Sequence, residues 1–327
     1  MKKTFLKILR ITLPLLLGVF IIYYSYNQFT QDQIEEIRSY IVTADYKWVF
    51  LSVFLAFLSH LSRAWRWNYM LQAMRYKPSF LTNTIAIGAG YAMNIFIPRS
   101  GEVARAAIIN RSDQVPVDKA LGTIIAERVL DVIMLLLITA TAVLSAGNAI
   151  IDFFKDNLDS ASAKADTSKL FLYLSIFLLL IVLVVFIAKK VQLIGKIKGF
   201  LYGMKEGFMT IWTMKKKWLY LLHTLFIWGM YITMFYVTIY AIPGIASIPL
   251  SAILCAFVAG SFAVAFTNGG FGAYPYFIAQ VLLIFGIEET LGSSFGWLLW
   301  LSQTSLVLVY GLVSLVLLAL RGSLSRN

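Results

Sequence analysis

The chain has 327 residues, of which 60% are hydrophobic and 13% are charged, and its net charge is +12. A soluble domain is about 45–50% apolar and about 25% charged, so this composition excludes an ordinary soluble protein. The single cysteine, Cys255, excludes a disulfide within the chain, and the two isolated histidines, His60 and His223, give no zinc or iron site.

The apolar runs predict an all-α, polytopic membrane protein without a metal or cofactor. Several runs exceed the roughly 18–20 residues that a helix needs to cross a bilayer. They are continuous rather than alternating, which favours a helical bundle over a closed barrel. In a soluble protein, a charge of +12 would suggest nucleic-acid binding. Here the Lys and Arg residues gather where cytoplasmic loops are expected, so we predict no nucleic-acid partner.

The first predicted span covers residues 8–26. A basic segment precedes it and no signal-peptidase pattern follows, so we expect an uncleaved helix rather than a signal peptide. Residues 27–47 are polar and slightly acidic, and we predict an outer loop there. A second span starts at Trp48, and Arg63 and Arg66 are expected at its cytoplasmic end.

Residues 80–111 form an unusual apolar segment. It is short and rich in Gly and Ala, and Pro98 and Gly101 interrupt it. Helix-breaking residues at membrane depth are tolerated where protein or an aqueous cavity surrounds them. We therefore predict a re-entrant hairpin with both ends on the cytoplasmic side. Residues 249–285 repeat the pattern, with a break at 267–272.

Four further spans bring the predicted total to about six, at residues 117–146, 170–188, 218–240 and 292–320. An outer loop is expected between the first two of them. Residues 189–217 hold eight lysines with apolar residues at helical spacing, which indicates an amphipathic helix on the cytoplasmic interface. This layout places both chain termini in the cytoplasm.

The order of span, broken segment and span occurs twice in the chain, and the distribution of charge gives the two units opposite orientations. Many secondary transporters are built as inverted repeats with broken helices near the substrate site. The alternative is that the two broken segments are ordinary loops. The predicted divisions are residues 1–47, 48–146 (first repeat), 147–217 and 218–327 (second repeat).

The first candidate site is the stretch Pro98-Arg99-Ser-Gly-Glu102-Val-Ala-Arg105, which opens a helix directly after the first break. The free N–H groups and the dipole at a helix N-terminus favour an anion. Arg99 and Arg105 add planar donor groups that suit a phosphate. The pattern predicts a seat for a phospholipid phosphate. The alternative is an interfacial loop whose arginines reach water, with Glu102 and Arg105 paired on one helix face.

The second candidate is the group Glu127, Arg128 and Asp131 within the apolar run 117–146. Charged groups at membrane depth are costly unless they are paired or face water, so we expect all three side chains to point into the protein. Arg128 would face the lipid phosphate and the carboxylates would hold it. An internal structural ion network and acid–base catalysis by the paired carboxylates are the alternatives.

The second break, Asn268-Gly269-Gly270-Phe-Gly272, is too rich in glycine for a helix and brings backbone amides close to any neighbouring ligand. Tyr274 is expected to line the same cavity or to pack in the core. Gln303 places a polar group in the last span, either in the site or between helices.

These three motifs, in this order, resemble the lysylphosphatidylglycerol synthase transmembrane family, also called flippase-like. The family pattern is Pro-x-x-Gly-Glu-x-x-Arg, then Glu-Arg-x-x-Asp in a span, then Gly-Gly-x-Gly in the second half. The chain carries them at residues 98–105, 127–131 and 269–272. The resemblance implies a bacterial inner-membrane protein that binds a phospholipid or polyprenyl-phosphate lipid and moves it between the leaflets.

Two departures limit what the resemblance implies. Members that make the lysyl lipid carry a soluble aminoacyl-transferase domain after the membrane part, and this chain stops seven residues past Leu320. Many relatives also have an acidic residue soon after the Gly-Gly-x-Gly break and an Arg in the last span. Pro275 stands near the first position and residues 300–303 contain no Arg. We expect a transporter; a lipid-modifying enzyme and a membrane subunit of a separate soluble synthase are the alternatives, and a homo-oligomer is a further expected assembly.

Overall fold

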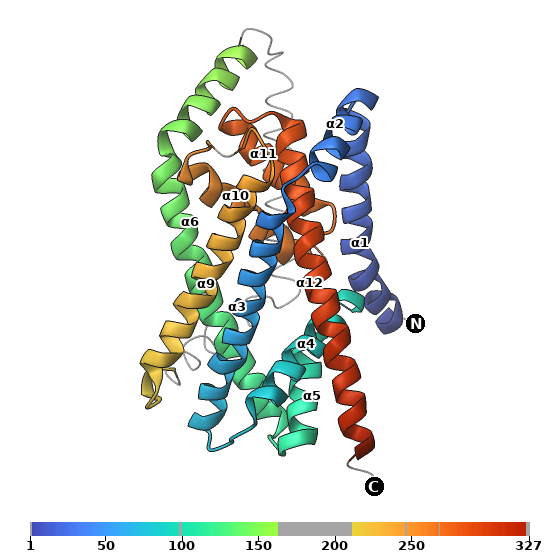
Figure 1. Cartoon of the computed structure of the whole chain (residues 1–327), viewed down its shortest axis with the longest axis vertical. Helices are drawn as coiled ribbons and strands as arrows, with labels where there is room; N and C mark the ends of the chain where they lie inside the picture. Colours follow the sequence, from blue (N-terminus) through green and yellow to red (C-terminus); the bar gives the residue numbers. More distant parts are fainter. Residues whose placement is uncertain (1, 98–99, 163–210, 246, 268, 325–327) are drawn as a thin grey trace.

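The computed structural model describes residues 2–97, 100–162, 211–245, 247–267 and 269–324, and every regular element in these ranges is a helix (Figure 1). The all-α prediction is therefore confirmed for the described chain. The predicted span at residues 170–188 lies outside these ranges, as does most of the predicted amphipathic helix at 189–217.

Four helices are long and apolar enough to cross a bilayer, and they form the frame of the molecule. They are α3 (Tyr46–Ala73), α6 (Val117–Ser162, apolar over Val117–Gly147), α9 (Lys217–Thr238, extended by the 3-10 turn η1, Ile239–Ala241) and α12 (Glu289–Leu324). All four were predicted as spans. Helix α6 continues to Ser162, so the outer loop predicted from residue 147 begins as helix.

The amino-terminal segment contains two helices, α1 (Lys2–Gln28) and α2 (Gln31–Val42). Helix α1 matches the predicted first span, although it is not among the four helices above. Helix α2 corrects the predicted outer loop. Its start is fixed by a capping box, in which Thr30 and Gln33 each bond the other's backbone N–H, and Ile34 and Ile37 face the last helix at Trp297. The apolar residues of this short helix are spaced so that they share one face. This spacing could have predicted the helix, but the segment as a whole is polar.

The first broken segment consists of α4 (Phe80–Phe96) and α5 (Gly101–Asp113). Two glycines let the helices touch. A Cβ on Gly90 would meet the Gly101 carbonyl oxygen at 2.9 Å, and a Cβ on Gly101 would overlap the Gly90 carbonyl oxygen. The Gly101 N–H also donates to Asn94 Oδ1 at 2.7 Å, so the turn between the helices is fixed by hydrogen bonding as well as by close packing.

The second broken segment consists of α10 (Leu250–Phe266) and α11 (Ala273–Ile284). The turn needs glycine, because Gly269, Gly270 and Gly272 all have a positive φ that other residues rarely adopt. Helix α11 lies against α12 through two more glycines: a Cβ on Gly292 would meet Ala279 Cα at 3.0 Å, and one on Gly296 would meet Pro275 Cα at 2.5 Å.

The two broken segments lie at opposite ends of the bundle. In Figure 1, α4 and α5 lie beside the last residues of α3 and the C-terminal part of α12, whereas α10 and α11 lie beside the first residues of α12. In each pair the second helix runs back beside the first, so the end of α4 and the start of α5, like the end of α10 and the start of α11, lie toward the middle of the molecule. Two apolar cores correspond to these ends, one around Trp67 and Ile109 and the other around Phe257 and Phe295.

Candidate functional site

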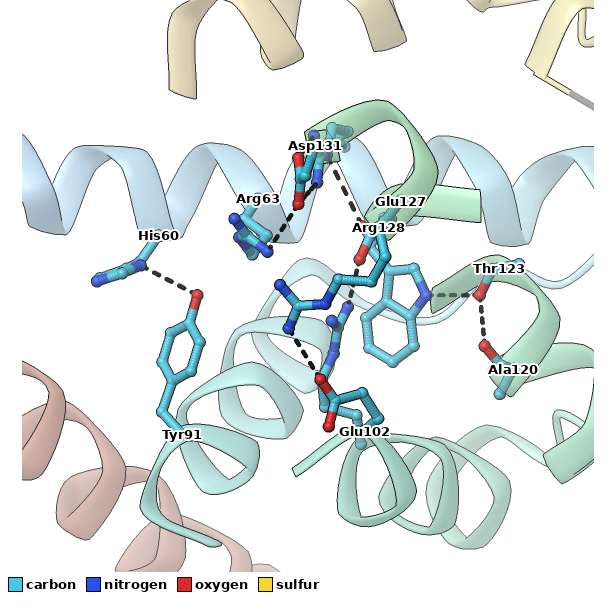
Figure 2. Close-up of polar contacts among 12 residues, drawn as sticks. His60, Arg63, Tyr91, Glu102, Ala120, Thr123, Glu127, Arg128 and Asp131 are labelled. Atoms are coloured by element: carbon cyan, nitrogen blue, oxygen red, sulfur yellow. Dashed lines mark hydrogen bonds and ion pairs between the residues drawn. The ribbon is translucent and has the colours of Figure 1, made fainter. Parts of the chain in front are cut away.

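Helices α3, α5 and α6 bring a group of charged side chains together inside the bundle (Figure 2). The group comprises Arg63 and Arg66 on α3, Arg105 on α5, and Glu127 and Asp131 on α6, and each of the five is at most 9% exposed. We call these five residues the buried charge cluster. At 1.5 Å per residue, the four cluster residues on α3 and α6 lie between about 10 and 20 Å from the nearer ends of these helices. If those ends mark the membrane boundary, the cluster lies at membrane depth.

Arg66 and Asp131 form the tightest contact in the buried charge cluster. Arg66 Nη1 donates to Asp131 Oδ1 at 2.8 Å and Nη2 donates to Oδ2 at 3.3 Å. Two parallel bonds between a guanidinium and a carboxylate fix direction as well as distance. Arg66 Nη1 also donates to Thr224 Oγ1 of α9 at 3.3 Å, so this pair links α3, α6 and α9.

Arg63, one turn before Arg66, has weaker contacts. Its Nη1 donates to Asp131 Oδ2 at 3.4 Å and its Nη2 donates to Tyr231 of α9 at 3.2 Å. Its Nε is buried without a partner. Asp131 therefore holds both arginines of α3. The sequence prediction was that Asp131 would hold Arg128, and it had placed Arg63 and Arg66 at a cytoplasmic helix end; the structure places them inside.

Arg105 joins α5 to the cluster. Its Nη2 donates to Glu127 Oε2 at 3.1 Å, while Glu127 Oε1 lies 3.8 Å from Arg66 Nε. The guanidinium also lies over the ring of Trp67, 4.2 Å from the centroid, where the electron-rich face attracts a cation. Trp67 is itself held by a 2.8 Å hydrogen bond from its Nε1 to Thr123 Oγ1. The alternative pairing of Arg105 with Glu102 on the same helix is not the one formed.

Arg128 and Glu102 form a second ion pair between α5 and α6, at the rim of the buried charge cluster. Arg128 Nη2 donates to Glu102 Oε1 at 2.9 Å, and Figure 2 shows the Arg128 side chain reaching across to it. The Arg128 side chain is 47% exposed and that of Glu102 is 27% exposed. The expectation that Glu127, Arg128 and Asp131 all point inward is thus wrong for Arg128. Consecutive helical residues point about 100° apart, so Arg128 cannot share the direction of Glu127.

The buried charge cluster is not neutral. It holds three guanidinium groups against two carboxylates, and the rim pair adds one charge of each sign. One positive charge is therefore left over among the described residues of the cluster. Arg63, Arg66 and Arg105 each also bury an Nε without a hydrogen-bond partner, as Glu127 buries its Oε1. An uncompensated charge in a low-dielectric interior is costly, and an added anion would offset it.

The predicted anion seat at the start of α5 is partly occupied by the protein. Because the Gly101 N–H already donates to Asn94, it is not free for a ligand. Arg99 and Asn268 lie outside the described residues. Arg105 and Arg128, which the sequence assigned to one phosphate seat, donate to different carboxylates instead.

The predicted residues of the second half belong to the other hairpin. Tyr274 packs on Gly260 of α10, and the Gly269 carbonyl accepts a hydrogen bond from Trp300 at 2.9 Å. Gly272 borders a cavity of about 190 Å³ between α1, α2, α11 and α12. Gln303 of α12 donates to Ser52 of α3 at 3.2 Å, a contact between helices. The structure therefore does not gather these residues around the buried charge cluster.

Two buried groups beside the cluster were not anticipated. His60, one turn before Arg63 on α3, shares a 3.2 Å hydrogen bond with Tyr91 of α4. Tyr310 of α12 lies against both rings and donates to the Thr84 carbonyl at 2.6 Å. The available signal was spacing: His60, Arg63 and Trp67 recur every three or four residues and so share one face of α3.

Residues 11–322 match the family described as the lysylphosphatidylglycerol synthase TM region, which is nearly the whole chain. The chain belongs to this family, as its motifs had indicated. It is a multi-pass membrane protein of a family involved in lipid handling. No curated protein and no solved structure matched the chain.

Proposed function

We propose that the chain is a lipid transporter of the bacterial inner membrane. It binds the anionic headgroup of a phospholipid or polyprenyl-phosphate lipid at the buried charge cluster and moves the lipid between leaflets. The observation that carries this proposal is the positive charge left over in the cluster among the described residues. A phosphate oxygen is the complement that arginine side chains bind best, because their planar donors match its geometry.

The arrangement of helices supports movement as well as binding. In this proposal the chain has six spans, and the pairs α4–α5 and α10–α11 are re-entrant hairpins of an inverted repeat. Such repeats place a substrate site near the membrane midplane, and rocking of one repeat against the other exposes the site to each side in turn. The cluster fits that plan because it links α3, α5 and α6 of the first repeat to Thr224 and Tyr231 of the second.

The test is translocation in liposomes. Phosphatidylglycerol with a fluorescent acyl chain is reconstituted with the protein, and dithionite added outside measures how fast inner-leaflet lipid reaches the outer leaflet. Arg105→Gln and Arg128→Gln should each slow the protein-dependent rate at least tenfold. Arg38→Gln, which breaks an exposed pair with Glu35 on α2, is the matched control and should keep the rate.

The same material separates the competing functions. Native mass spectrometry of the purified protein should show a bound lipid of unaltered mass, lost in both site variants. Wild-type translocation by both site variants, with no lipid retained, would remove this site from consideration. A lipid product of new mass would replace transport by enzymatic modification, and co-purification of a soluble synthase would favour the role of a membrane subunit.

A further inference from the structure

The ion pairs that join α5 to α6 differ in strength from the pair that joins α3 to α6. Arg66 and Asp131 share two hydrogen bonds. On α5, by contrast, Arg105 gives Glu127 one hydrogen bond and Glu102 receives one from Arg128. Paired bonds are stronger and better directed than single ones. The charged contacts of α5 with α6 are thus single hydrogen bonds, whereas the Arg66–Asp131 contact of α3 with α6 is paired.

Both single-bonded pairs leave buried polar atoms unsatisfied. Glu102 Oε2 and Arg105 Nε on α5, and Glu127 Oε1 on α6, are buried without a hydrogen-bond partner. A buried acceptor or donor without a partner costs free energy that a better partner would recover. The contact between the start of α5 and α6 is therefore one that a suitable ligand can improve upon.

The two pairs lie at the end of α5 that is farther from its connection to α6. Helix α5 is joined to α6 at its far end by a short turn, where Gln114 has a left-handed conformation. Glu102 and Arg105 lie in the first turns of α5, at the opposite end from that connection. Release of the two pairs would detach the start of α5 from α6, while its contacts with Gly90 and Asn94 keep it on α4 and the turn at Gln114 holds its end.

Exposure orders the arginines from the rim inward. The Arg128 side chain is 47% exposed, that of Arg105 is 6% exposed and that of Arg66 is fully buried. An anion that arrives from outside the cluster thus meets Arg128 first, and Glu102 already occupies it. A carboxylate on a cation competes directly with any other anion for the same donors.

Resting on the proposed function, we propose that Glu102 is a built-in competitor for the anionic headgroup. Its carboxylate holds Arg128 until the headgroup displaces it, and the exchange releases the start of α5 from α6 and opens the buried charge cluster. Glu102 then sets a threshold: an uncharged or zwitterionic headgroup gains too little at Arg128 to replace a carboxylate. Glu102 is a selectivity residue in this scheme, and Glu127 holds Arg105 until the headgroup reaches that inner pair.

The first experiment measures binding. Dihexanoyl-phosphatidylglycerol, a soluble anionic lipid, is titrated into the protein in nanodiscs of zwitterionic lipid. Glu102→Gln should bind it about tenfold more tightly than wild type, because the ligand no longer has to displace the Glu102 carboxylate from Arg128. Glu35→Gln, from the exposed pair on α2, is the matched control and should bind like wild type.

The second experiment measures opening. Ala106 is fully buried beside Arg105, so in a Cys255→Ser background an Ala106→Cys variant reports exposure of this face of α5 through its rate of maleimide labelling. Dihexanoyl-phosphatidylglycerol should speed the labelling severalfold, and the zwitterionic dihexanoyl-phosphatidylcholine should not. Glu102→Gln should speed it without ligand. Ala256→Cys, buried in α10, is the control whose labelling stays constant.

The outcomes distinguish the two proposals. If wild type binds the anionic lipid through Arg105 and Arg128, but Glu102→Gln binds it no more tightly and Ala106→Cys labelling does not respond, the competitor is ruled out and the transporter stands. If neither wild type nor Glu102→Gln binds the anionic lipid, both the proposed headgroup site and the competing role of Glu102 are ruled out.

Discussion

Arg66 is the arginine of the buried charge cluster that lies near both of its carboxylates. It is 0% exposed and gives Asp131 two hydrogen bonds. Its Nε lies 3.8 Å from Glu127 Oε1. Its guanidinium thus lies between the two buried carboxylates. Burying a charge is tolerable when a partner is fixed beside it, so the carboxylates of α6 and the arginine of α3 stabilise one another.

Replacement of Arg66 by Met, which keeps the length of the side chain, should destabilise the fold. Removal of one partner from a buried ion pair typically costs about 3–5 kcal/mol, because the other charge stays buried without compensation. We expect a loss of that order in the free energy of unfolding, measured by chemical denaturation in nanodiscs. Arg38→Met on the surface of α2 should change it by less than about 1 kcal/mol. Equal effects of the two substitutions would show that Arg66 contributes no more to the free energy of unfolding than an exposed arginine does.

At the residue scale, the sequence predicted the acidic half of the cluster better than the basic half. Glu127 and Asp131 stand in a long apolar run, where a carboxylate has to point inward, and their burial could be deduced. Arg63 and Arg66 sit among tryptophans near a helix end, a composition equally typical of a membrane interface. Only the 28-residue length of α3, which carries the helix past them to Ala73, places them inside.

At the scale of elements, the contact between α4 and α5 sets the position of Arg105. The side chain of Arg105 runs across the surface that Gly90 leaves open, since a Cβ on Gly90 would lie 2.9 Å from Arg105 Cγ. The same added atom would lie 2.9 Å from the Gly101 carbonyl oxygen. The small residues of α4 therefore serve a site on α5 as well as the packing of the hairpin.

Gly90→Ala should consequently weaken both the fold and the site. Overpacking a close contact costs about 1–3 kcal/mol, and here the backbone of α5 or the Arg105 side chain has to move. We expect a loss of unfolding free energy in that range together with weaker binding of anionic lipid. The matched control is Gly122→Ala in α6, where an added Cβ meets nothing within 4 Å. That change should stabilise by about 0.5–1 kcal/mol, as Gly→Ala does inside helices. Loss of stability in both variants would mean that general helix effects, not the α4–α5 contact, decide the result.

The sequence located the two broken segments well and the helix α2 poorly. Runs of small residues ending in Pro98 and Gly101, or in three glycines, leave few alternatives to a turn, and α4, α5, α10 and α11 begin and end within a few residues of the prediction. In α2, polar and charged residues together outnumber apolar ones, and what makes it a helix is its capping box and its contact with Trp297 of a distant helix. Contacts between distant segments are not visible in local composition.

At the scale of the whole molecule, α12 ties the two hairpins together. Gly292 and Gly296 near its start lie against α11, and Gly311, with Ser314, lies against Ala92 and Gly88 of α4. Small residues at helix contacts are the usual means of close packing in membranes, where no hydrophobic force drives the helices together. Helix α12 thus contacts the α10–α11 hairpin at one end and the α4–α5 hairpin at the other. A motion of either hairpin would therefore take place against the same helix.

The opposite placement of the hairpins leads to a prediction about topology. Ser112 lies at the exposed end of α5, and Ser247 lies in the exposed segment before α10. If the hairpins are re-entrant from opposite faces, these two positions lie on opposite sides of the membrane. In a Cys255→Ser background, a membrane-impermeant maleimide added to intact cells should label Ser247→Cys and spare Ser112→Cys, which should react only after permeabilisation. Thr43→Cys, exposed between α2 and α3, should behave like Ser247→Cys, and the Cys255→Ser chain alone should stay unlabelled. Labelling of Ser112→Cys and Ser247→Cys from the same side would contradict the inverted repeat and, with it, alternating access through the buried charge cluster.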